Sequence, residues 1–102
     1  YAPCVPVYLN LDGDTAKLSK AYDKFVSNGQ KPVLLVENPS VFGNRNTYPI
    51  GSTDLEVSHN LFENLRILET KYDCIIASFT SKTEFAQSIL NRLVRSAGGK
   101  LL

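Results

Sequence analysis

The pattern of apolar and polar residues predicts alternating strands and helices. Residues 5–11 alternate apolar and polar side chains, which is the period of a strand with one wetter face. Residues 33–37 and 74–79 carry apolar runs typical of strands that are covered on both faces of a sheet. Three further segments repeat apolar residues at helical spacing, and they lie at 15–27, 54–71 and 82–97.

This order predicts an α/β fold with three layers and a mostly parallel sheet, because helices that join parallel strands have to cross the faces of the sheet. Pro6 lacks an N–H group for a strand ladder, which places the first strand at an edge. Residues 100–102 are either a frayed tail or a further strand. We expect residues 1–102 to form a single domain. The start at Tyr1 and the absence of methionine indicate a piece of a larger protein.

The segment 38–51, NPSVFGNRNTYPIG, is rich in Asn, Gly and Pro but also carries large apolar side chains. Loops of this length within a domain often have a function. The segment is either a small hairpin at 40–50 or a binding loop, and its apolar content favours an excursion that packs on the domain. If it recognises a partner, its candidate contact residues are Val41, Phe42, Arg45, Tyr48 and Ile50.

Composition excludes several classes of protein. The chain is 43% hydrophobic, has a net charge of +1 and lacks a strongly basic half, which disfavours nucleic-acid binding. It has no apolar run long enough for a membrane span. Cys4 and Cys74 lie far apart in sequence, and the chain contains only one histidine. This composition predicts free thiols, no zinc site and a cytoplasmic location. Composition leaves the oligomeric state open.

Polar residues follow each of the three predicted strands. The carboxyl ends of parallel strands lie at one edge of a sheet, and ligands bind there. Carboxylates at this edge suit Mg²⁺, and hydroxyls beside a helix N-terminus suit phosphate. The same side chains also make turns and helix caps, and this structural interpretation is the favoured one. The candidate ligand-binding residues are Asp12, Asp14, Thr15, Glu37, Asn38, Ser78, Thr80 and Ser81.

Two short motifs resemble known families. NLDGDT, at 10–15, is similar to the first motif of haloacid dehalogenase phosphatases, with Asn10 at the position of the nucleophilic aspartate. VLLVENP, at 33–39, is similar to the opening of Toprim nuclease and topoisomerase domains, with Glu37 at the position of the family's glutamate. An amide cannot form an aspartyl-phosphate, and the later strand lacks the aspartate pair of Toprim domains. Neither resemblance therefore predicts an activity.

The sequence contains no complete catalytic set. The favoured hypothesis is a non-catalytic α/β interaction or regulatory module, which needs no cofactor and binds a protein partner or other domains of its parent chain through segment 38–51. The alternative is a metal- or phosphate-dependent enzyme or a nucleotide-binding domain. It would use the carboxyl edge of the sheet, with Asp12, Asp14 and Glu37 on Mg²⁺ and residues 78–83 on phosphate.

Overall fold

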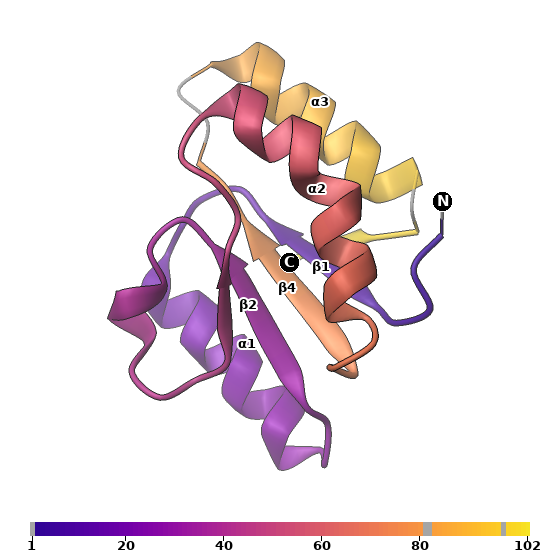
Figure 1. The fold of residues 1–102 in the computed structure, drawn as a ribbon. Coiled ribbons are helices and arrows are strands. Elements are labelled where there is room, and N and C mark those ends of the chain that lie inside the picture. Colours follow the sequence, from indigo (N-terminus) through magenta and orange to yellow (C-terminus); the bar gives the residue numbers. More distant parts are fainter. Residues whose placement is uncertain (1, 81–82, 97) are drawn as a thin grey trace.

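Five parallel strands form one sheet with the spatial order β3-β2-β4-β1-β5 (Figure 1). The computed structural model describes residues 2–80, 83–96 and 98–102. The α/β architecture and the parallel sheet predicted from the sequence are confirmed. The strands are β1 at Val7–Asn10, β2 at Pro32–Val36, β3 at Thr47–Pro49, β4 at Cys74–Ser78 and β5 at Lys100–Leu101.

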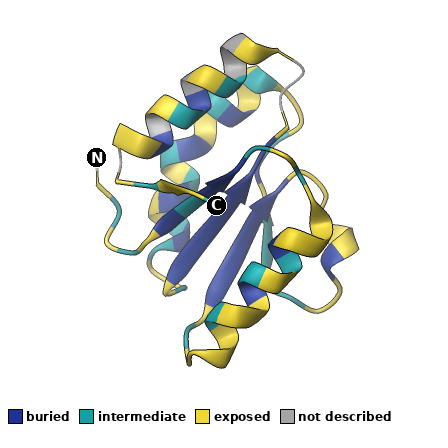
Figure 2. Cartoon of the chain, turned by 180° about the vertical axis from the view of Figure 1, so that it is seen from behind, coloured by how far each residue is buried: buried dark blue, intermediate teal, exposed yellow. Residues whose placement is uncertain are grey.

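Helices cover both faces of this sheet (Figures 1 and 2). On one face, α1 buries Leu18 and Tyr22 against the strands, together with Phe42 of a short 3₁₀ helix, η1. On the other face, α2 and α3 pack on the larger part of the core. None of the described helices is both long and apolar enough to cross a membrane. The helices are α1 at Thr15–Ser27, η1 at Pro39–Phe42, α2 at Asp54–Leu68 and α3 at Glu84–Ser96.

The two central strands are buried on both faces. Every residue from Val33 to Val36 and from Cys74 to Ala77 is at most 2% exposed, and Figure 2 shows these strands in dark blue between the helical layers. The register pairs Val33 with Ile75 and Leu35 with Ala77. Their continuous apolar sequence is therefore explained by helices on both sides.

The prediction that the first strand lies at an edge is wrong. β1 pairs with β4 on one side and with β5 on the other. Pro6 precedes the strand, and its carbonyl accepts a hydrogen bond from the Ile75 N–H at 3.0 Å. At this position the ladder uses only the carbonyl group of the proline, as an acceptor, so the missing N–H does not interrupt the ladder. Residues 100–101 supply the additional edge strand.

The hairpin considered for residues 40–50 is also wrong. Pro39 begins the 3₁₀ turn η1, and the chain then returns as β3, which is parallel to β2. The Leu34 N–H donates to the Asn46 carbonyl, and the Ile50 N–H donates to the Val36 carbonyl, both at 2.9 Å. Burial of the Phe42 ring favours this route, because a tight hairpin would leave the ring outside the core. The segment is a packed excursion, as its apolar content indicated.

Gly99 lies where the chain turns from α3 into β5, and it has almost no free space. A Cβ atom there would overlap the Val94 side chain and would lie 2.8 Å from the Val94 carbonyl oxygen. We expect Gly99→Ala to lower the free energy of unfolding by about 2 to 3 kcal/mol, because the contact with backbone cannot relax. Urea denaturation of the variant measures this loss.

Gly98→Ala is the matched control. Gly98 has φ +84° and no atom within 4 Å of the added methyl group, so its substitution costs only backbone strain, about 1 kcal/mol. Equal losses in the two variants would contradict the packing argument at Gly99.

Candidate functional site

The carboxyl ends of β1, β4 and β2 are neighbours in the sheet. The chain leaves β1 and β2 toward α1 and η1 on one face, whereas it leaves β4 toward α3 on the other face (Figure 1). Connections that depart to opposite faces open a crevice between neighbouring strands, which is where parallel α/β domains bind ligands. The structure therefore brings the three predicted polar stretches together at one edge.

A pocket of about 320 Å³ occupies this crevice on the α1 side. Most of the predicted ligand-binding residues line it. Asp14 caps α1 and is not part of the lining, and Ser81 lies outside the described residues. The polar lining consists of Asp12, Thr15, Glu37, Asn38, Ser78 and Thr80, and the apolar lining consists of Leu18, Val36, Val41 and Phe42.

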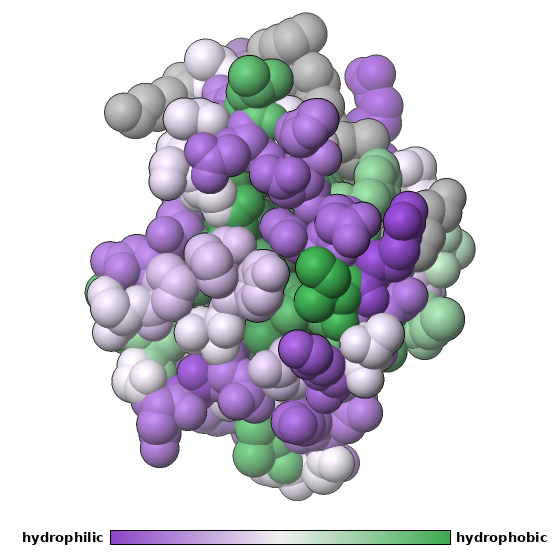
Figure 3. Space-filling view, viewed as in Figure 1, coloured by the Kyte–Doolittle hydropathy of each residue, from purple (hydrophilic) through white to green (hydrophobic). Residues whose placement is uncertain are grey.

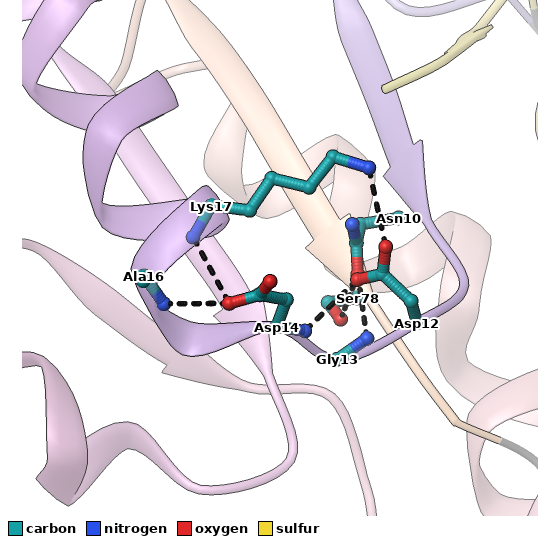
Figure 4. Close-up of polar contacts among 7 residues, drawn as sticks. All are labelled: Asn10, Asp12, Gly13, Asp14, Ala16, Lys17 and Ser78. Atoms are coloured by element: carbon teal, nitrogen blue, oxygen red, sulfur yellow. Dashed lines mark hydrogen bonds and ion pairs between the residues drawn. The ribbon is translucent and has the colours of Figure 1, made fainter.

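Asn10 organises the turn at the end of β1 (Figure 4). Its side chain is 1% exposed, and its Oδ1 atom accepts hydrogen bonds from the Gly13 N–H at 2.8 Å and from Ser78 Oγ at 3.1 Å. Its Nδ2 atom is buried and has no hydrogen-bond partner of good geometry among the described residues. The sequence resemblance placed Asn10 at a nucleophile position, whereas its observed contacts are structural. The sequence feature that corresponds to this structural role is a polar residue at the end of a strand whose other residues are apolar.

The two aspartates after β1 both make local hydrogen bonds (Figure 4). Asp14 Oδ1 accepts from the N–H groups of Ala16 and Lys17, at 3.0 and 3.2 Å, which caps α1. Asp12 Oδ1 accepts from the Asp14 N–H at 2.9 Å, and Asp12 Oδ2 pairs with Lys17 Nζ at 3.1 Å. Asp14 is therefore the N-cap residue of α1, whereas Asp12 braces the preceding turn.

These contacts favour the charged form of Asp12. The hydrogen bond from the Asp14 N–H, the nearby Asn10 amide and the Lys17 ammonium group, in that order, lower the pKa of Asp12 from 3.8 to about 2. Asp12 therefore carries a full negative charge at neutral pH.

Glu37 connects the end of β2 to the loop after β4. One of its carboxylate oxygens, Oε1, accepts from both the backbone N–H and the hydroxyl of Thr80, each at 2.7 Å. Glu37 and Thr80 also line a second hollow of about 260 Å³, next to Phe79 and the start of α2. This pair therefore separates the two hollows of the carboxyl edge.

The described residues do not bring together a cluster of metal ligands. No group of three or more His, Cys, Asp or Glu side chains among them is placed to hold a metal ion, so the geometry does not support Mg²⁺ binding by Asp12, Asp14 and Glu37. The two cysteines are free. Burial raises the pKa of the Cys74 thiol to about 11, with a further contribution from Asp73, which disfavours the thiolate form at neutral pH.

Segment 38–51 is held against its own domain. Phe42 and Ile50 are each 3% exposed, and Tyr48 packs against the core. Arg45 forms a two-pronged ion pair with Asp23 of α1, at 3.0 and 2.8 Å. Of the predicted contact residues, Val41 is the one that the structure leaves exposed, at 50%. Recognition through the buried side chains would require the segment to unpack.

The fold and the crevice define a class: a three-layer parallel α/β domain with a half-apolar pocket at the carboxyl edge of its sheet, where Glu37 is hydrogen-bonded to Thr80 and Ser78 to Asn10. Residues 1–98 match the family described as the C-terminal domain of threonylcarbamoyl-AMP synthase. The chain belongs to this family of domains, which form part of the enzyme Sua5. Neither the phosphatase nor the Toprim resemblance pointed to it.

Solved structures show the same fold. Sua5 from P. abyssi in complex with L-threonine has a TM-score of 0.77 and 23% identity, and the match covers 100% of this chain and 31% of that one. A C-terminal Sua5 domain from Pyrococcus horikoshii has a TM-score of 0.74 and 22% identity, and the match covers 99% of this chain and 98% of that one. No curated protein sequence matches. The chain therefore spans about a third of the full-length relative.

The double acceptor role of Asn10 predicts a stability loss on truncation. Asn10→Ala leaves the Gly13 N–H and the Ser78 hydroxyl without an acceptor in a buried place, which costs about 1 to 3 kcal/mol of unfolding free energy. The exposed Asn44 offers a control, since Asn44→Ala should change stability by less than about 0.5 kcal/mol. Thermal or urea unfolding compares the two, and a neutral Asn10→Ala variant would contradict the assigned role.

The depressed pKa of Asp12 predicts a pH dependence. The folded-state pKa of about 2 lies below the ordinary value of 3.8, so between these values the unfolded chain binds more protons than the folded one. The stabilisation by Asp12 is complete above about pH 4 and is lost as the pH falls toward 2. A carboxyl-carbon NMR titration should give a midpoint near 2 for Asp12, and the Asp12→Asn variant should lose less stability over this range. A midpoint near 4 would contradict the contacts.

Proposed function

We propose that this chain is a non-catalytic accessory domain of a threonylcarbamoyl-AMP synthase, which contacts the rest of that enzyme and supports its activity by binding rather than by chemistry. The observation that carries the proposal is the state of the carboxyl edge. Asn10 bonds Ser78, Glu37 bonds Thr80, and Asp14 caps a helix. Groups that are occupied in this way are not poised for proton transfer or nucleophilic attack.

The surface also suits a modest contact with another part of the enzyme. The exposed large apolar residues of the described chain lie on four different elements. On the face that Figure 3 shows, apolar surface forms separate patches among hydrophilic side chains. Contacts between domains of one chain are typically more polar than permanent subunit interfaces. A large apolar docking face is therefore not required. The exposed large apolar residues are Val26, Val41, Leu55 and Leu101.

Substitutions at the crevice of the full enzyme test the non-catalytic role. We expect Ser78→Ala and Thr80→Val to leave the kcat for threonylcarbamoyl-AMP formation within about threefold of the wild type, because loss of a catalytic acid or base typically costs 10²- to 10⁴-fold. Unfolding midpoints of the same variants separate stability effects from effects on chemistry. A hundredfold fall in kcat with an unchanged midpoint would show that the domain takes part in the reaction.

A further inference from the structure

The carboxyl-edge pocket combines an apolar lining with an acidic rim. Leu18, Val36 and Phe42 contribute apolar walls, and Val41 stands at the opening with half of its surface exposed. The contact of an exposed apolar side chain and an apolar hollow with water is unfavourable. A partner that fills the hollow would remove both apolar surfaces from water.

The charged side chains that line this pocket in the described part of the chain are both acidic. Asp12 from the end of β1 and Glu37 from the end of β2 line the pocket, and among the described residues no lysine, arginine or histidine does. Lys17 neutralises Asp12 only in part, because their ion pair is about half exposed to solvent. The pocket therefore favours a cationic occupant.

The same features disfavour a phosphate or nucleotide. The N–H groups of Ala16 and Lys17, which an anion would use at the start of α1, already donate to Asp14. The Thr80 N–H is likewise held by Glu37. An anion would have to displace these carboxylates and would meet their negative charge.

We propose that this pocket receives a lysine or arginine side chain from the part of the parent synthase that lies outside this domain. Such a side chain has a long apolar stem and a charged head. The stem packs against Val41 and Phe42, and the head lies between Asp12 and Glu37. The P. abyssi relative holds roughly two thirds of its chain outside the matched region, which leaves ample chain to carry the residue. This inference rests on the accessory role proposed above.

Site-specific photo-crosslinking in the full-length enzyme tests it. A photoreactive amino acid replaces Val41 at the pocket, and a matched control replaces Val26, which is 49% exposed on α1 and does not line the pocket. We expect position 41 to crosslink, within one enzyme molecule, to a peptide that contains lysine or arginine. Position 26 should give less than about a tenth of that yield.

The charge is tested in the same assay. Asp12→Asn keeps the side-chain shape and the acceptor for the Asp14 N–H but removes the charge, and it should lower the yield at position 41 several-fold. Raising the salt from about 0.05 to 1 M should do the same, because it shortens the screening length from over 10 Å to about 3 Å. A yield that is insensitive to both changes overturns the basic side chain as occupant.

The remaining outcomes separate this inference from the proposed function. Crosslinks to the rest of the enzyme from other exposed positions, such as Leu55, but none from position 41, would overturn the pocket as the docking site and leave the accessory role standing. If no position on the domain crosslinks to the rest of the enzyme, both proposals fail. A crosslink from position 41 to a second molecule or to another protein would also overturn the inference.

Discussion

Burial of the central strands on both faces is the constraint on which the rest of this structure depends. β2 and β4 expose almost no surface, so an apolar helical layer has to lie on each side of the sheet. Parallel strands satisfy this requirement, because each crossover places a helix or a turn on one face. The alternation of faces then sends the chain away from neighbouring strand ends in opposite directions. The crevice at the carboxyl edge is thus a consequence of how the core is covered.

The same constraint explains why the crevice is rich in hydrogen bonds within the domain. Where the strands end, their backbone groups lose ladder partners but remain close to the core, and side chains have to satisfy them. Asn10, Asp14 and Glu37 each accept at least two hydrogen bonds there. Polar residues at such an edge resemble an active site in sequence, although Asn10, Asp14 and Glu37 each make structural hydrogen bonds. The presence of polar residues at a sheet edge is therefore not enough to indicate a site. Some of their polar groups must also be free to bind a ligand.

Membership in the Sua5 family gives this arrangement a context. The chain corresponds to one domain of a longer synthase. In the proposed accessory role, the half-apolar acidic pocket holds another part of the same enzyme, and such an intramolecular contact needs little affinity because the effective concentration is high. The ion pair between Arg45 and Asp23 joins segment 38–51 to α1, and Val41 of this segment lines the pocket. In this view the segment shapes a binding surface rather than acting as a mobile loop.

The sequence by itself determined the elements and the edge at which polar groups gather. Period-two and helical patterns located three strands and three helices, because burial of one face or both faces leaves a local imprint on residue order. Only the tertiary structure decided the places of β1, β3 and β5, the parallel return after η1 and the partners of each carboxylate. A proline that precedes a strand looks the same in sequence whether the strand lies at an edge or inside the sheet. The position of the strand depends on which other strands pair with it. Likewise, the sequence does not show which group meets Glu37, and the structure shows that Thr80, 43 residues later in the chain, donates to its carboxylate. Such contacts between distant residues leave no local pattern in the sequence.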